Sequence, residues 1–231
     1  MKRHLTFLLL TLAVGPAAQG GIFNFNNLSA TIPDGDLNGY QNSQSLTGLS
    51  GGITHVSVTL NISGGINGDL YAYLYHDNTS AILLNRVGRS SASSVGYPDA
   101  GFGPDASAHS FTLDDQAAAD VHLYRSFAYS INGGGQLTGA WQPDGRTLDP
   151  LSPGSAFDGA TRSETLSLFN GLDANGTWTL FVADVSSGGE STLNGWGLQI
   201  TTVPEPSVVG LLVLGACFAI WKTRPQGCLQ T

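Results

Sequence analysis

The chain has 231 residues, a formal net charge of −8 and only two cysteines. Its length suits one domain with a sizeable core, and its acidic balance argues against a nucleic-acid partner, which selects a basic surface. Between Gly21 and Thr202 there are five Arg, no Lys, fourteen Asp and two Glu, so the central region is strongly acidic. Cys217 and Cys228 lie beyond this region, so no disulfide can link its parts.

The N-terminal segment has the order of a secretory signal peptide. Two basic residues, an apolar run over Leu5–Val14 and then small residues follow one another. A charged part, an apolar part and small residues at a cleavage site are the three components of such a signal. We therefore expect residues 1–20 to direct export, with cleavage near Ala18 or Gly20.

An acidic loop follows, in which Asp34, Asp36 and Asn38 occupy alternate positions. Carboxylate and amide oxygens at this spacing, together with backbone carbonyls, can bind Ca²⁺. Asp69 and Asp184 lie at the ends of predicted strands and are candidates for a second calcium site. The alternative is that these side chains cap turns by accepting hydrogen bonds from backbone amides. No other cofactor is indicated by the sequence.

Alternation of apolar and polar residues predicts strands through the central region. The segments Val56–Ile62, Leu70–Tyr75, Trp178–Val182 and Trp196–Ile200 each have a period of two, which is typical of a strand with one buried face. Turns rich in Gly and Asn separate these segments. Only Asp114–Leu123, with three consecutive alanines, predicts a helix. The pattern therefore predicts an all-β fold, an antiparallel β-sandwich.

Aromatic side chains on these strands have two interpretations. Trp178 and Trp196 alternate with aliphatic neighbours, so we expect both in the core, where each indole N–H needs one acceptor. Tyr71, Tyr73 and Tyr75 share one face of their strand. An open face there favours carbohydrate binding by stacking, whereas a covering sheet or loop argues against it.

No catalytic constellation emerges from the sequence, and we expect a protein that is not an enzyme. Ser50 lies in a Gly-x-Ser-x-Gly pattern, but a strand follows where that motif requires a helix. A glycosidase site needs two carboxyl groups, and the pairs Asp34/Asp36 and Asp114/Asp115 supply that residue type. Nothing else in the sequence points specifically to such a site. Four central histidines lack metal-ligand spacing and are predicted to lie on the surface: His55, His76, His109 and His122.

Six short blocks of the central region follow one another along the chain. They are Ile32-Pro33-Asp34-Gly35, Gly68-Asp69-Leu70, Leu83-Leu84-Asn85-Arg86, Phe169-Asn170-Gly171-Leu172, Asn175-Gly176-Thr177-Trp178-Thr179-Leu180 and Thr192-Leu193-Asn194-Gly195-Trp196. In this order and separation they resemble the P domain (P/Homo B domain), which follows the subtilisin-like catalytic domain in kexin, furin and many bacterial secreted proteases. The resemblance implies a jelly-roll-like β-sandwich of about eight strands over residues 30–202. Residues 87–140 match weakly, and the chain has no room for a protease domain.

The C-terminal tail carries a second resemblance. Pro204, Glu205 and Pro206 precede the apolar run Val208–Trp221, and two basic residues follow it. The run is short for a hydrocarbon core but has no polar face, so we predict a membrane helix with its C-terminus on the cytoplasmic side. The order resembles a PEP-CTERM sorting signal over residues 203–225. That resemblance implies recognition and removal of the tail by an exosortase-type processing enzyme during export from a Gram-negative cell.

These features predict a non-enzymatic β-sandwich that is first anchored in the membrane by its C-terminal hydrophobic helix. It then reaches the cell surface or extracellular matrix of a Gram-negative bacterium. The expected role is adhesion, matrix formation or protein interaction, with exopolysaccharide or a surface protein as partner. The alternatives are a carbohydrate-binding module and an accessory domain of a secreted hydrolase or protease system.

Overall fold

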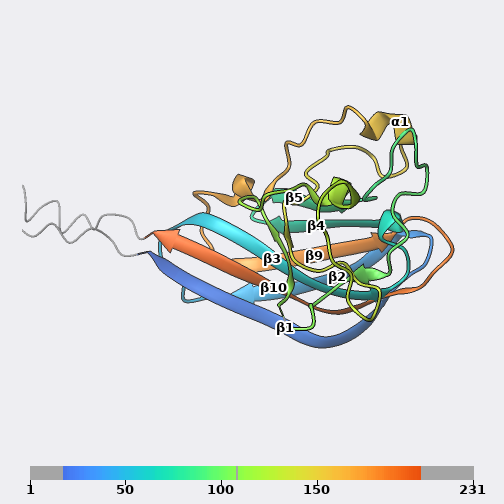
Figure 1. Ribbon diagram of the computed structural model, residues 1–231. Helices are drawn as coiled ribbons and strands as arrows, with labels where there is room; N and C mark the ends of the chain where they lie inside the picture. The colour runs from blue at the N-terminus through green and yellow to red at the C-terminus, as the bar shows by residue number, and fades with distance from the viewer. Residues whose placement is uncertain (1–17, 108, 204–231) are drawn as a thin grey trace, which may run out of the picture.

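Two β-sheets pack face to face in the computed structural model, which describes residues 18–107 and 109–203 (Figure 1). The strands are β1 (Gln19–Ile32), β2 (Asp36–Leu46), β3 (Gly52–Gly64), β4 (Leu70–His76), β5 (Thr79–Asn85), β6 (Gly101–Phe102), β7 (Phe111–Asp114), β8 (Ala140–Trp141), β9 (Gly176–Asp184) and β10 (Ser191–Val203). One sheet, called sheet A here, has the order β1-β10-β3-β7-β8, with β6 paired to β3. Sheet B has the order β2-β9-β4-β5. Neighbouring strands are antiparallel except for the parallel pair β7–β8, so the predicted all-β sandwich is confirmed.

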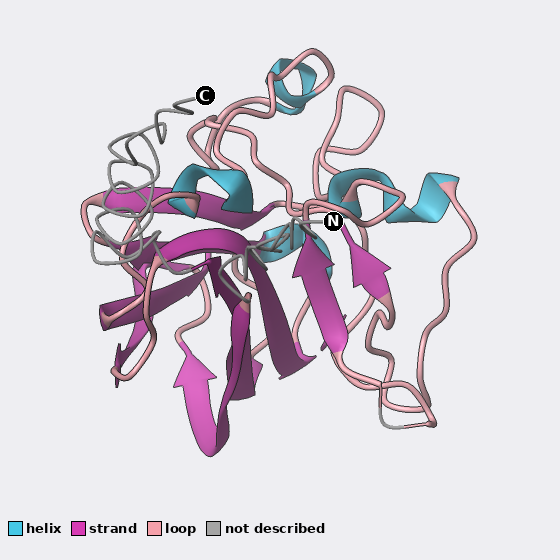
Figure 2. Cartoon of the chain, turned by 90° about the vertical axis from the view of Figure 1, so that its left-hand side faces the viewer, coloured by secondary structure: helices cyan, strands magenta, loops and turns pink. Residues whose placement is uncertain are grey.

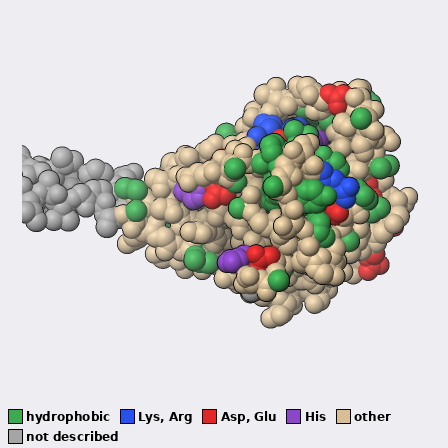
Figure 3. Space-filling view, in the orientation of Figure 1, with side chains coloured by type: hydrophobic (Ala, Val, Ile, Leu, Met, Phe, Trp, Pro, Cys, Tyr) green, Lys and Arg blue, Asp and Glu red, His purple; other side chains and the backbone are tan. Residues whose placement is uncertain are grey.

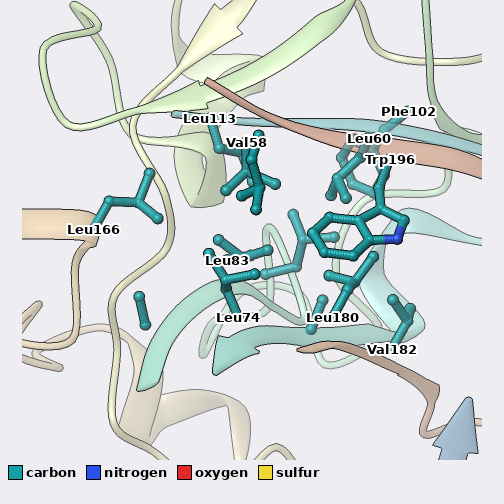
Figure 4. Close-up of a cluster of buried hydrophobic side chains, with 14 of the residues drawn as sticks. Val58, Leu60, Leu74, Leu83, Phe102, Leu113, Leu166, Leu180, Val182 and Trp196 are labelled. Carbon is teal, nitrogen blue, oxygen red and sulfur yellow. The ribbon is translucent and has the colours of Figure 1, made fainter. Parts of the chain in front are cut away.

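The core lies between the two sheets because the apolar positions of both alternating patterns point inward (Figure 4). Val58 and Leu60 of β3 and Trp196 of β10 come from sheet A. Leu74 of β4 and Leu180 of β9 meet them from sheet B, and all five side chains are buried. Burial of such side chains is the main favourable term in folding. A chain whose central region has no cysteine therefore depends on this interface for its stability.

The helical segments are short and lie between strands (Figure 2). They are η1 (Asn67–Asp69), η2 (Val121–Ser126), α1 (Gly154–Phe157) and η3 (Leu166–Phe169). Within the described ranges, none is long and apolar enough to cross a membrane. The membrane helix predicted over residues 208–221 and the motif Pro204–Pro206 lie outside the described residues.

The helix predicted over Asp114–Leu123 is wrong. Asp114 ends β7, its carboxylate accepts a hydrogen bond from the backbone N–H of Gln116, and a turn begins there. Asp120 then caps η2 by accepting a hydrogen bond from the N–H of His122. Starting a helix is costly for so short a segment, and aspartates at both ends offer the backbone competing turn hydrogen bonds.

The first strand extends the sandwich beyond its predicted beginning at Ala30. Gln19 is the register partner of Thr202, and pairing with β10 continues through Asn26 before a bulge. Ser50 Oγ also donates a hydrogen bond to Gln19 Oε1 at 2.7 Å. The last two residues of the predicted signal segment are therefore strand residues, and the sandwich begins at Gln19.

This boundary predicts the processing site of the exported protein. Cleavage after Ala18 leaves the whole of β1 in the sheet, whereas cleavage after Gly20 removes two of its paired residues. We expect the exported protein to begin at Gln19 and to lack the tail beyond the motif Pro204–Pro206. Intact-mass measurement checks both ends at once. A product that retains residues beyond Trp221 would contradict removal of the tail, and one that begins after Gly20 would contradict the N-terminal part.

The long segment 86–108 is rich in Gly, Ser and Pro, a composition that predicts a surface loop, but part of it is buried. Val87 and Phe102 are completely buried, and the backbone N–H of Gly68 donates to the carbonyl of Tyr97 at 2.9 Å. This segment thus packs against η1 and the edge of β3. Its Gly and Ser content allows the turns that this close packing needs.

Candidate ligand-binding faces

The outer face of sheet B carries a cluster of aromatic side chains, called the aromatic face here: Tyr71, Tyr73 and Tyr75 of β4 and Phe181 of β9. Their chain neighbours in β4, such as Leu74, are buried in the core, so the tyrosines point away from it. Tyr73 and Phe181 are register partners, and their rings stack with centroids 4.7 Å apart. Tyr71 lies 6.1 Å from Tyr73, edge to face.

The aromatic face is open at one end and more enclosed at the other. Tyr75 is 40% exposed, and its hydroxyl donates to Asn78 Oδ1 at 3.0 Å. Tyr71 is partly buried, and burial, with a smaller effect from the nearby carboxylate of Glu164, raises the pKa of its hydroxyl to about 12. Phe181 is only 7% exposed beneath the tyrosines. The face therefore offers exposed aromatic edges around Tyr73 and Tyr75 rather than one flat platform.

Polar side chains continue the outer face of sheet B toward its β2 edge. Ser43 and Thr179 are register partners, and their hydroxyls lie 2.8 Å apart. Gln41 pairs with Phe181 beside them. Aromatic rings next to neutral hydroxyl and amide groups form a surface with one apolar and one hydrogen-bonding part. Such a surface can stack a sugar ring and bind its hydroxyls.

The two predicted core tryptophans are both buried, which confirms the interpretation made from their alternation. Trp178 Nε1 donates to the carbonyl of Ala174 at 3.0 Å. Trp196 Nε1 donates to Asn42 Oδ1 at 2.9 Å, and its ring lies 4.7 Å from that of Phe25. Each indole N–H has the acceptor that burial requires.

The prediction that the histidines are surface residues is wrong for two of them. His76 is 3% exposed, and its two ring nitrogens lie 3.0 Å and 2.7 Å from the carbonyls of Thr177 and Asp173. His122 is 2% exposed, and its Nδ1 lies 2.7 Å from Asp144 Oδ2. A buried histidine needs hydrogen-bond partners, and the partners of these two histidines lie far away in the chain. The sequence around each histidine therefore gave no indication that it would be buried.

The His122–Asp144 pair belongs to a buried ionic network and not to a catalytic triad. Asp144 also binds Arg146, whose guanidinium contacts Asp120 at 2.8 Å. The second ring nitrogen of His122 lies 3.0 Å from the carbonyl of Arg89. In a catalytic triad, the nucleophile would occupy the place of this carbonyl, so that its proton could pass to the second ring nitrogen. The role of the network is therefore structural, because it joins three separate segments of the chain.

The residues considered for catalysis are separated and engaged elsewhere. Ser50 lies between β2 and β3 and is bonded to Gln19, as described above. Asp114 pairs with His55 at 3.1 Å, on a partly exposed surface. Asp115 accepts hydrogen bonds from two backbone amides at the beginning of η3. These contacts place neither a serine–histidine pair nor two facing carboxylates in one cleft.

The acidic loop adopts the turn-capping arrangement. Asp36 Oδ1 accepts hydrogen bonds from both the backbone N–H and the side-chain Nδ2 of Asn38, at 2.9 Å and 2.8 Å. The carboxylate of Asp34 accepts from the backbone N–H of Gly188, which lies in the turn before β10. In the described ranges, no group of three or more His, Cys, Asp or Glu side chains is placed to hold a metal ion.

Asp69 and Asp184 do come close together, next to Arg86. The guanidinium of Arg86 binds Asp69 Oδ1 at 3.1 Å. Asp184 is completely buried, and its Oδ2 has no hydrogen-bond partner within the described part of the chain. Burial, with smaller effects from the charges of Asp69 and Asp34, raises the pKa of Asp184 to about 6, against the opposing effects of the Ser186 backbone N–H and of Arg86. Burial also raises the pKa of Asp69, against the opposing effect of Arg86.

Charged side chains are sparse on the side of the molecule that Figure 3 shows, where neutral polar and hydrophobic side chains and backbone predominate. The central region as a whole is acidic, because 14 aspartates and two glutamates are accompanied by only five arginines. Two of these arginines, Arg86 and Arg146, are used in buried pairs. The negative net charge therefore disfavours anionic ligands.

No protein-family model matches the chain, and no curated protein is similar to it. Among solved structures, the complex of an Aeromonas sobria serine protease with its chaperone, ORF2, is similar at 16% identity and a TM-score of 0.41, over 82% of this chain and 28% of that chain. The serine protease of Aeromonas sobria in a separate crystal structure gives 16% identity and a TM-score of 0.40, over 81% and 27%. The chain thus spans little more than a quarter of these structures. The class of the protein, an all-β sandwich, rests on its own two sheets.

Proposed function

We propose that this protein is an exported, non-enzymatic binding module that attaches to polysaccharide at the cell surface or in the extracellular matrix. The aromatic face of sheet B carries the proposal. On this face the exposed Tyr75 and the partly exposed Tyr71 and Tyr73 lie beside the polar side chains Ser43, Thr179 and Gln41, and a contiguous patch of this kind marks an interaction site. Aromatic rings with adjacent neutral hydrogen-bonding groups suit the ring faces and hydroxyls of sugars.

Removing exposed aromatic rings should weaken the attachment to polysaccharide. Loss of one stacked ring costs about 0.5–1.5 kcal/mol, so Tyr75→Ala should lower affinity roughly two- to tenfold, and Tyr73→Ala should act in the same direction. The measurement is co-sedimentation of the purified protein with fractionated cell-surface polysaccharide. Tyr75→Phe should retain binding, because it keeps the ring.

Tyr129→Ala is the matched control, since Tyr129 is 42% exposed on a different part of the surface. The thermal midpoint of each variant must also be measured, because Tyr73 stacks on Phe181 and its removal could lower stability. A loss of binding counts only where the thermal midpoint is unchanged. Equal retention of wild type, Tyr75→Ala and Tyr73→Ala on every fraction would contradict the role of the aromatic face.

The route to the exterior is a proposal that rests on the two ends of the sequence. The N-terminal segment directs export, and the tail acts as a PEP-CTERM-type signal that an exosortase-type enzyme of a Gram-negative cell recognises and removes. Before removal, the run Val208–Trp221 anchors the precursor in the membrane. The sandwich is compatible with this route, because its first and last strands, β1 and β10, are neighbours, and Gln19 and Thr202 are register partners at one end of the fold.

The P-domain resemblance supports the same class of function. A jelly-roll-like P domain acts through its surface and not through its own chemistry. An accessory domain of a secreted protease system would need a surface that contacts the protease. A carbohydrate-binding module would need exposed aromatic rings on which a sugar can stack. The aromatic cluster around Tyr73 and Phe181 favours the second of these alternatives.

A further inference from the structure

A polar trough lies on the outer face of sheet A, on the opposite side of the sandwich from the aromatic face. Two cross-strand rows form its floor, each with a glycine of β10 in the middle: Asn24–Gly197–Thr59 and Asn26–Gly195–Asn61. Trp196 and Leu198 of β10 point into the core, so these rows face outward. Pro104 and Ser110 flank the trough, which has a volume of about 230 Å³.

The two glycines of β10 let polar side chains of the neighbouring strands close over them. A Cβ atom at Gly197 would lie 2.7 Å from Thr59 Oγ1 and 2.8 Å from Asn24 Oδ1, so these two side chains lean over the glycine from both sides. A Cβ atom at Gly195 would lie 2.8 Å from the carbonyl oxygen of Phe25 and 3.1 Å from Asn26 Oδ1. The missing side chains of β10 therefore bring the polar groups of β1 and β3 together on the floor of the trough.

The chemistry of the trough is neutral and offers both donors and acceptors. None of its lining residues is ionisable. Amide and hydroxyl side chains both donate and accept hydrogen bonds, as the hydroxyls of a sugar do. Asn61 Oδ1 already accepts a hydrogen bond from Gln136 Nε2 at 3.2 Å, which orients its amide, and the exposed Asn24 and Asn26 add two further amides. The acidic character of the central region disfavours an anionic ligand.

The position of the trough argues against a peptide ligand. An extended peptide gains affinity by pairing with an exposed sheet edge. The backbone of β10 is paired on both sides, with β1 and β3, so a ligand on the floor of the trough meets side chains, whereas the edge of sheet A at β1 lies beside the floor. The trough has the space of about eight liquid waters at ~30 Å³ each, which suits a single sugar ring.

We propose that this trough is a second ligand site, which binds one unit of a neutral saccharide through the amides of Asn24, Asn26 and Asn61 and the hydroxyl of Thr59. The inference shares with the function proposed above only the class of ligand, because its residues belong to the other sheet. Two sites on opposite outer faces allow one molecule to contact two polysaccharide chains.

The test is calorimetric titration of the full chain, purified in detergent, with maltohexaose, cellohexaose and chitohexaose. The Asn24→Ala/Asn26→Ala double variant should bind the recognised oligosaccharide about tenfold more weakly or worse, because it removes two amide partners. The isosteric Asn24→Asp/Asn26→Asp variant should also lose affinity, because it replaces the donors by charged acceptors. Asn170→Ala, at an exposed asparagine outside the trough, should bind as wild type does.

Tyr75→Ala separates this site from the aromatic face. Weaker binding in the asparagine variants alone supports the trough, whereas weaker binding in Tyr75→Ala alone supports the aromatic face and overturns the trough. Absence of binding to all three neutral oligosaccharides also overturns the trough, as does equal binding of polygalacturonate. Thermal melts of the asparagine variants should match that of wild type, because both residues are exposed on the edge strand.

Discussion

Replacing Trp178 by alanine is expected to lower the free energy of unfolding by about 3–5 kcal/mol, because the change leaves a large cavity in the core. Trp178 is completely buried. Its ring stacks on that of His76 with centroids 4.0 Å apart and also contacts Phe169 at 5.0 Å. The variant leaves the carbonyl of Ala174 without the indole donor as well. Urea unfolding measures the change.

Two matched variants make the Trp178 result specific. Trp178→Phe keeps most of the buried volume and should cost clearly less than Trp178→Ala. Tyr75→Ala removes an aromatic ring from the exposed surface and should alter stability by less than about 1 kcal/mol. If Trp178→Ala unfolds at the same urea concentration as wild type, the ring is not part of the core, and the stack with His76 does not form in solution.

Asp184→Asn is expected to stabilise the protein by about 2–3 kcal/mol at pH 7.5 and to leave its stability unchanged near pH 4. Burial raises the pKa of Asp184 from 3.8 to about 6, so the native state holds its proton more tightly than the unfolded state does. One pKa unit corresponds to 1.36 kcal/mol. The stabilising proton is therefore present below about pH 4, and this stability is lost as pH rises through about 6.

Denaturant unfolding from pH 4 to pH 8 measures the Asp184 effect. The wild-type free energy of unfolding should fall across the window from pH 4 to pH 6 more steeply than that of Asp184→Asn. Asp36→Asn is the control, because Asp36 lies at the beginning of β2 with its carboxylate bonded within an exposed turn. Parallel pH profiles for wild type and Asp184→Asn would contradict the burial of a carboxylate whose Oδ2 has no hydrogen-bond partner within the described residues.

The same variant tests the calcium prediction. A cation bound beside Asp69 and Asp184, the predicted second calcium site, would stabilise only the folded state and would raise the thermal midpoint in calcium. That rise should then be absent in Asp184→Asn. Magnesium at equal ionic strength is the control, since its strict octahedral geometry makes it a poor substitute for calcium. Equal shifts with both ions, unchanged in the variant, would indicate charge screening alone.

Local sequence patterns predicted most of the strands because alternation is a short-range property. The segments around Val58, Tyr73, Leu180 and Trp196 each show one buried and one outward face, and the structure places them in sheets as expected. The beginning of β1 was not predicted. It is an edge strand rich in Gly and Asn, and its pairing partner, β10, lies about 170 residues away in the chain.

The candidate sites likewise have one part that local sequence patterns predict and another part that depends on long-range strand pairing. The shared face of Tyr71, Tyr73 and Tyr75 was predictable, since residues two apart on a strand point in one direction. The contribution of Phe181 was not, because it depends on the register between β4 and β9. Likewise, no local pattern distinguishes the buried His122 from the exposed His109.

Period-two burial follows from side-chain direction along a strand, so the fold class and the core tryptophans could be predicted from local patterns. The processing signals at the two ends of the chain remain predictions. The way in which distant segments meet could not be predicted. It includes the Asn–Gly–Thr and Asn–Gly–Asn rows of the trough and the buried Asp184 Oδ2, which has no partner within the described residues. It also includes the turn contacts of the acidic loop and the ion pair of Asp69. Each of these depends on strand order and register, which arise from packing the two sheets as a whole and which no short window of residues contains.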